Sequence, residues 1–274
     1  MKKRLISAAV GLSLLIIILL LYHTFILNAA IAILGAISIY EFIRAIGLKE
    51  HKPLLILCLL FALWLPFAEK AGMYDLRVES IVLFILCIFI YFISSHEKVR
   101  IESLVCTASI TIAISFSLTC LITIRDQFPN DSLYYIFLVF IIAWVCDAGA
   151  YFVGRAIGKH KMSPIISPNK TFEGAIGGII VNGVVVAIVT IIFSLWVYHT
   201  MSIQIISLIL VTLIGSIIAI LGDLSASAIK RQFQIKDFGN LLPGHGGAID
   251  RFDSMFFVAP FLYFWLLHFP ILGG

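Results

Sequence analysis

Residues 203–222 read IQIISLILVTLIGSIIAILG, a stretch without a single charged side chain, and Asp223 follows it directly. A helix of about 20 apolar residues is long enough to cross the hydrocarbon core of a bilayer. In lipid every backbone polar group must be bonded within the protein, so long runs without apolar–polar alternation favour helices over barrel strands. The stretch therefore predicts a membrane-spanning helix that ends at an acidic residue.

Similar apolar runs recur along the whole chain. Of its 274 residues, 61% are hydrophobic and 12% are charged, and the mean hydropathy is +1.10. Soluble domains carry about 25% charged residues, so the composition excludes a water-soluble globule, a disordered chain and a disulfide-rich secreted module. We predict an all-α polytopic membrane protein with about nine transmembrane helices, near residues 5–22, 25–43, 53–68, 80–95, 104–124, 133–153, 175–197, 203–222 and 254–271.

The basic residues predict the orientation of these helices. The start, Met1-Lys2-Lys3-Arg4, could open a signal peptide, but its apolar run is long and many spans follow, which favours an uncleaved first helix. With nine spans and a cytoplasmic N-terminus, 16 of the 19 Lys and Arg residues face the cytoplasm. We therefore expect the C-terminus outside.

The two halves of the chain differ in their loops. Residues 1–130 have short loops and are predicted to form a lipid-facing scaffold of transmembrane helices. Residues 131–274 contain two long inside loops, 154–174 and 223–253, rich in Gly, Pro and charged residues. Long loops in compact proteins are usually functional, so we expect the catalytic region there.

The second of these loops has the most informative composition. Residues 222–253 read GDLSASAIKRQFQIKDFGNLLPGHGGAIDRFD. If the preceding helix continues past Asp223, then Asp223, Ser227 and Lys230 share one face. Asp250 and Asp253 form a second acidic pair at the start of the last span, after a glycine-rich turn. Carboxylates bind hard cations and Lys or Arg neutralises phosphates, so the pattern predicts a magnesium–polyphosphate site.

A solvated inside loop with ordinary surface ion pairs is the alternative. It explains the basic residues but not the acidic residues at the edges of two apolar spans, where loss of hydration is costly. Asp147, within or at the end of the span 133–153, is a further candidate. Its alternatives are a buried hydrogen bond to another helix or a salt bridge with Arg155.

The first loop ends in SPNKTFEG at residues 167–174. Thr171 suits a helix N-cap with Glu173 in the first turn. Lys170, just before a helix N-terminus, would suit a phosphate. Gly174 and Gly178 predict close packing between helices. The five cysteines lie in apolar runs without metal-ligand spacing, which indicates small buried side chains and no disulfide framework.

The second loop and its surroundings resemble the sequence pattern of a known family. The stretch 227–253 is similar to the signature of the phosphatidate cytidylyltransferases (CDP-diacylglycerol synthases). The matching positions are Ser227, Lys230-Arg231, Lys236-Asp237, Gly239, Pro243, His245-Gly246-Gly247 and Asp250-Arg251-Phe252-Asp253. Segments 147–155 and 167–174 also look like family segments, whereas Ala248 stands where the family usually has a larger apolar residue. The D-G-x-x-A-R signature of enzymes that consume CDP-diacylglycerol is absent.

The resemblance implies a nucleotidyltransferase that converts CTP and phosphatidate to CDP-diacylglycerol and pyrophosphate. It implies Mg²⁺, a second cation such as K⁺, a lipid bilayer and a homodimer, and no nucleic-acid partner. Together with the predicted topology, it implies the cytoplasmic membrane of a bacterial cell, with the active site facing the cytoplasm. We expect catalytic roles for Asp223, Asp250, Lys230, Arg231 and His245. Substrate contacts are expected from Lys170, Ser227, Lys236, Arg251 and Asp147. The expected metal ligands are Asp223, Asp250 and Asp253, with Asp147 as an outer-sphere or further ligand.

Two rival functions stay open at this stage. One is another CTP-using membrane enzyme with a different lipid acceptor, such as a polyprenol, which only the lipid pocket would distinguish. The other is a cation-coupled transporter with Asp147 and Asp223 as an ion relay. A transporter would need acidic residues near mid-membrane in paired broken helices, whereas here the charged residues cluster at one predicted face.

Overall fold

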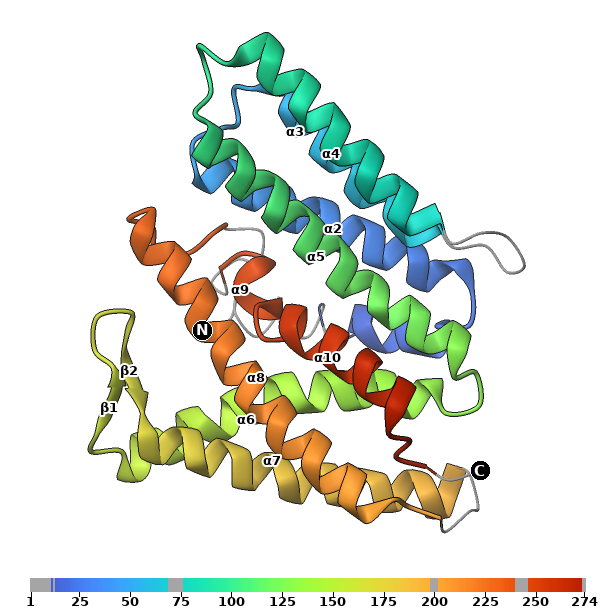
Figure 1. The fold of residues 1–274 in the computed structure, drawn as a ribbon. Coiled ribbons are helices and arrows are strands. Elements are labelled where there is room, and N and C mark those ends of the chain that lie inside the picture. The colour runs from blue at the N-terminus through green and yellow to red at the C-terminus, as the bar shows by residue number, and fades with distance from the viewer. Residues whose placement is uncertain (1–10, 12, 69–75, 198–201, 240–245, 273–274) are drawn as a thin grey trace. The chain divides into compact units, whose positions relative to one another are not determined.

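A computed structural model describes residues 11, 13–68, 76–197, 202–239 and 246–272. Within them the chain is almost wholly helical (Figure 1). The α-helices are α2 (Phe25–Ala45), α3 (Lys52–Trp64), α4 (Leu76–Ser95), α5 (Ile101–Gln127), α6 (Ser132–Ile157), α7 (Phe172–Ile192), α8 (Ile205–Gln232), α9 (Ile249–Phe252) and α10 (Met255–His268). The short elements are η1 (Leu65–Phe67), η2 (Phe193–Val197), β1 (Lys161–Ser163) and β2 (Ser167–Thr171).

Six of the described helices are long and apolar enough to cross a membrane, namely α2, α4, α5, α6, α7 with its extension, and α8. The α3–η1 segment and α10 are shorter apolar helices. Residues 13–20 are also helical, in the first predicted span. A multi-pass, helical membrane protein is thus confirmed, whereas the count of nine spans and the sides of the termini stay predictions.

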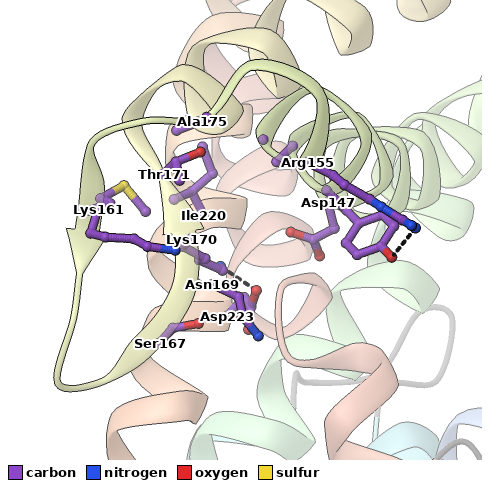
Figure 2. A pocket seen from close by; sticks show the side chains of 15 residues that line it. Asp147, Arg155, Lys161, Ser167, Asn169, Lys170, Thr171, Ala175, Ile220 and Asp223 are labelled. Atoms are coloured by element: carbon purple, nitrogen blue, oxygen red, sulfur yellow. Dashed lines mark hydrogen bonds and ion pairs between the residues drawn. The ribbon is translucent and has the colours of Figure 1, made fainter.

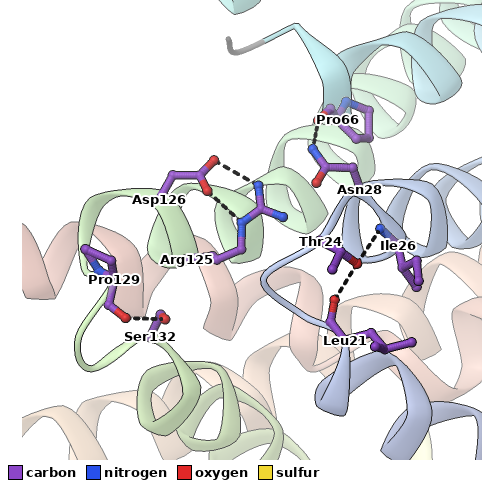
Figure 3. A network of polar contacts seen from close by, with 9 residues as sticks. All are labelled: Leu21, Thr24, Ile26, Asn28, Pro66, Arg125, Asp126, Pro129 and Ser132. Atoms are coloured by element: carbon purple, nitrogen blue, oxygen red, sulfur yellow. Dashed lines mark hydrogen bonds and ion pairs between the residues drawn. The ribbon is translucent and has the colours of Figure 1, made fainter. Parts of the chain in front are cut away.

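Local polar contacts fix where several helices begin (Figure 3). The hydroxyl of Thr24 caps α2 by accepting the N–H of Ile26 at 3.2 Å, and it donates to the carbonyl of Leu21 at 2.7 Å. The Asn28 amide donates to the Pro66 carbonyl at 2.6 Å and so ties α2 to η1. In the turn before α6, Ser132 donates to the carbonyl of Pro129 at 3.2 Å.

The chain forms two compact units. The first comprises residues 1–122 and 233–251. In it α2 packs on α3 and α3 packs on α4, where the rings of Phe61 and Phe84 stack with centroids 4.3 Å apart. Phe42 of α2 contacts the rings of Phe233 and Phe238, so the segment 233–239 belongs to the same core as α2.

The second unit comprises residues 123–232 and 252–274, with α6, α7, α8 and α10 packed together. Glycines bring α6 and α7 into close contact: a Cβ on Gly178 would lie 2.7 Å from the Cys146 carbonyl oxygen, and one on Gly174 would lie 2.7 Å from that of Ala150. The predicted role of these two glycines in helix packing is therefore confirmed. The fully buried Asn182 of α7 donates to the hydroxyl of Ser216 of α8 at 2.7 Å.

Both predicted long loops are shorter than the sequence indicated. Helix α6 continues to Ile157, and strands β1 and β2 form an antiparallel hairpin before α7. Helix α8 continues past Asp223 to Gln232, because the polar residues there keep a helical spacing. Thr171 caps α7 by accepting the N–H of Gly174 at 3.1 Å, with Glu173 in the first turn, as predicted.

Candidate active site

A cavity of about 470 Å³ lies within the second unit, where the β1–β2 hairpin meets α6, α7 and α8. Its size is that of ordinary ligand pockets. It is lined by acidic, basic and neutral polar side chains together with glycine, alanine and larger apolar residues. The polar residues are Asp147, Tyr151, Arg155, Lys161, Ser167, Asn169, Lys170, Thr171 and Asp223.

Asp223 and Lys170 meet at this cavity (Figure 2). Asp223 projects from α8 and Lys170 from β2, and the Lys170 ammonium forms an ion pair with the Asp223 carboxylate. Both side chains are about a quarter exposed, at 24% and 22%. Ser227, one turn along α8, donates to the other oxygen of Asp223 at 3.4 Å. The predicted grouping of Asp223 with Ser227 is therefore confirmed, and Lys170 joins it.

Asp147 projects from α6 toward the same cavity (Figure 2). The hydroxyl of Ser254, the residue before α10, donates to its carboxylate at 2.8 Å. Arg155 instead approaches the Tyr151 hydroxyl at 3.4 Å. Of the two structural alternatives for Asp147, the described contacts include the hydrogen bond to another helix and not the salt bridge with Arg155.

Asp253 is the most buried acid of this unit, with 8% of its surface exposed. Burial, together with the negative charges of Asp223 and Asp147, raises the pKa of its carboxyl group to about 7. The N–H of Ser254 and the charge of Lys230 act in the opposite direction. Three aspartates from α6, α8 and the α9–α10 turn thus lie within electrostatic range of one another.

These residues fit a cation that is bound together with phosphate. Among the residues that the structure describes, no three Asp, Glu, His or Cys side chains stand close enough to hold a metal ion by themselves. Proteins usually hold Mg²⁺ through one or two carboxylates, with substrate phosphates and water as the other ligands. Here, mutually repelling aspartates lie beside Lys170. They could supply one or two carboxylate ligands, and the remaining ligands would come from phosphate and water.

Basic residues supply the complementary charge. Arg155, Lys161 and Lys170 line the cavity. The guanidinium Nε of Arg231 donates to the carbonyl of Ile166 at 3.1 Å, and this contact holds the hairpin against α8. Arg231 therefore has a structural contact in addition to its predicted role toward phosphate.

Asp250 lies in the first unit, where one of its carboxylate oxygens accepts two backbone N–H groups. The donors are Phe238 at 2.9 Å and Gly247 at 3.1 Å. Lys236 and Arg251 are exposed in the same unit. His245 lies outside the described residues. The expected roles of these four residues toward substrate or metal stay predictions.

Several polar residues around the cavity and near Asp250 are not predicted from the sequence. Lys161 and Asn169 line the cavity, but no spacing in the sequence relates them to Asp223. Glu41, a buried acid of α2, contacts the segment that precedes Asp250. An acidic residue inside an otherwise apolar predicted span was the available signal for Glu41.

Comparisons with known proteins agree with this chemistry. Residues 2–269 match the Cytidylyltransferase family. The chain is 36% identical over 275 residues to a phosphatidate cytidylyltransferase of Bacillus subtilis, covering 97% of each chain. It is 32% identical over 276 residues to one of Staphylococcus saprophyticus, covering 96% of this chain and 97% of that one. A Staphylococcus haemolyticus relative of the same name is 50% identical over 133 residues, about half of each chain. The resemblance seen in the signature is thus confirmed, and the chain belongs to the cytidylyltransferase family.

Proposed function

We propose that this chain transfers the cytidylyl group of CTP to phosphatidate and releases pyrophosphate, which makes CDP-diacylglycerol for phospholipid synthesis. The family match along nearly the whole chain supports the reaction type. The observation that carries the proposal is the cavity in which Asp147 and Asp223 stand among Arg155, Lys161 and Lys170. This mixture of charges suits a polyphosphate bound with a cation.

The reaction needs positioning and charge stabilisation more than proton transfer. An oxygen of the lipid phosphate forms a bond to the α-phosphorus of CTP, and the bond from that phosphorus to the bridging oxygen of pyrophosphate breaks. A phosphate monoester has its second pKa near ~6 and is already largely ionised at neutral pH. The attacking group therefore requires no general base.

The basic residues of the cavity would hold the phosphates in line. Lys170 is in the position to exchange its ion pair with Asp223 for a phosphate oxygen, and Arg155 and Lys161 line the same space. Lys230, Arg231, Lys236 and Arg251 remain candidates for the triphosphate or the lipid phosphate. Ser227 and His245 would orient phosphate oxygens.

Asp223, Asp250 and Asp253 would hold Mg²⁺, with Asp147 as an outer-sphere or substrate-binding residue. The bound cation supplies positive charge that neutralises the phosphates and the departing pyrophosphate. We also propose a second cation such as K⁺, an active site facing the cytoplasm, and a homodimer, on the strength of the family resemblance and the distribution of basic residues.

Asp223→Asn tests the site directly. In purified protein in detergent, we expect it to reduce magnesium-dependent formation of CDP-lipid by at least about 100-fold, since one charge-stabilising contact can contribute that much to the rate. Asp126→Asn, which alters an exposed aspartate outside the cavity, is the matched control and should retain activity. Near-normal activity of Asp223→Asn would contradict the site.

The lipid acceptor needs a separate arm of the assay. Phosphatidate and a polyprenyl phosphate are each offered with labelled CTP, and label in the lipid phase is measured. Product with phosphatidate alone supports the proposal. Product with the polyprenyl phosphate alone would assign a different lipid acceptor to the same chemistry.

A further inference from the structure

Glu41 is a carboxylate inside the apolar helix α2, and only 4% of its surface is exposed. Burying a charged side chain within a predicted membrane span costs free energy unless the charge is paired or hydrogen-bonded. Residues of this kind are therefore candidates for a functional role. Neither the signature nor the cavity of the second unit includes this residue. The role of Glu41 must therefore be inferred from the residues that it contacts.

The Glu41 carboxylate receives backbone N–H groups from the turn before α9. The N–H of Ile249 donates to its Oε2 at 3.3 Å, and the N–H of Ala248 also interacts with the carboxylate. Arg44, one turn further along α2, lies within electrostatic range. The other oxygen, Oε1, has no hydrogen-bond partner among the described residues.

Two glycines of the signature make room for this carboxylate. A Cβ on Gly239 or on Gly247 would collide with Glu41. At Gly239 the three nearest atoms to that Cβ all belong to the Glu41 side chain. The absence of a side chain at Gly239 is thus explained by Glu41.

The carboxylate of Asp250 accepts other N–H groups of the segment that Glu41 contacts. Its carboxylate accepts the N–H groups of Phe238 and Gly247, while Ile249 and Ala248 face Glu41. Gly246, which begins this turn, has φ +84°, a left-handed conformation that favours glycine. Successive N–H groups of one turn are therefore shared between two carboxylates, and displacing one alters the support of the other.

We propose that Glu41 is a positioning residue, which holds the turn 246–249 so that the carboxylate of Asp250 keeps the orientation in which it would bind the metal. This inference rests on the proposed function, in which Asp250 is a ligand. Glu41 acts through the turn and touches no substrate. It extends the catalytic machinery to α2, in the half of the chain predicted to be a scaffold.

Amide hydrogen exchange of the purified protein tests the contact without any activity measurement. In Glu41→Gln we expect exchange at residues 247–249 to be about tenfold faster or more, because hydrogen bonds to a charged acceptor are replaced by weaker ones. The amides of α7 should be unchanged and serve as the internal reference. Glu97→Gln, at an exposed acid, is the matched control. Unchanged exchange at 247–249 would overturn the proposal.

The magnesium dependence of CDP-lipid formation separates positioning from mere folding. We expect Glu41→Gln to raise the half-saturating Mg²⁺ concentration several-fold, and Glu41→Asp to restore part of it. A purely structural residue would lower the amount of active enzyme without moving that concentration, and this outcome would overturn the proposal. If the wild-type protein makes no CDP-lipid, the proposed function fails, whereas the exchange experiment still reports on the turn.

A double-mutant cycle checks the packing directly. Gly239→Ala should lower the thermal unfolding temperature in the wild-type background, since its methyl group meets the Glu41 side chain. In the Glu41→Ala background the same change should lower that temperature much less. Equal decreases in both backgrounds would contradict the contact on which the proposal depends.

Discussion

At the scale of single residues, the acidic positions separate into three kinds of environment. Asp223 is paired with Lys170, Asp147 accepts a hydroxyl, and Asp253 is buried beside both. The sequence predicted these aspartates because ionisable residues at the edges of apolar spans are unusual. Glu41 also stands out as an acid inside a predicted span, but its contact with Ile249 was not predicted. The two residues are 208 positions apart, so no local spacing reveals that contact.

The raised pKa of Asp253 predicts that the stability of the fold depends on pH. Its pKa in the folded chain, about 7, lies above its ordinary value of 3.8, so the folded state favours the protonated form. Its contribution to stability is present at low pH and is lost as the pH rises from about 4 through 7. In metal-free protein with a chelator, Asp253→Asn should therefore raise the unfolding temperature at pH 8 and change it little at pH 4.

Thermal unfolding at both pH values, with Asp126→Asn as the control, checks this expectation. The same Asp253→Asn variant should lose magnesium-dependent activity, because the group that destabilises the fold is the one proposed to hold the cation. A variant that is equally destabilised at pH 4 and pH 8 would contradict the account of Asp253.

At the scale of elements, the long apolar runs predicted the helices, whereas no sequence pattern predicted the β1–β2 hairpin. The span predicted at 203–222 was too short, since α8 continues past Asp223 to Gln232. Asp223, Ser227 and Lys230 therefore stand in one helix, which was the condition for their sharing a face. Strands β1 and β2 have three and five residues, and Pro168 stands within β2. Strands this short carry no readable alternation, and proline argues against a strand in sequence-based prediction. Contacts with α6, α7 and α8 stabilise the hairpin instead.

The packing of α6 against α7 predicts contrasting effects of two glycine substitutions in one helix. Gly178→Ala should destabilise the protein by about 1–3 kcal/mol, because its Cβ would lie 2.7 Å from the Cys146 carbonyl oxygen and 2.9 Å from the Cβ of Ala150. Gly183→Ala, where a Cβ meets nothing within 4 Å, should be neutral or stabilising by up to about 1 kcal/mol. Unfolding temperatures in the same detergent compare the two, and equal effects would contradict the predicted helix contact.

At the scale of the whole molecule, the apolar runs located the helices because a membrane span must satisfy its backbone internally over a fixed length. Each predicted span from 25–43 onward falls on a described helix, although α3 and α10 are shorter than a straightforward span. Sequence could not assign the segment 233–251 to the unit of α2, since that depends on the aromatic contacts of Phe42 and on Glu41. The predicted division into a scaffold and a catalytic region stays a prediction.

The fate of each phosphate of CTP distinguishes cytidylyl transfer from other reactions of the nucleotide. The purified protein is given phosphatidate, Mg²⁺ and CTP labelled either at the α-phosphate or at the γ-phosphate. The account predicts that the α-label enters the lipid phase and that the γ-label is released as pyrophosphate. Entry of the γ-label into the lipid, or of neither label, would contradict cytidylyl transfer by this chain.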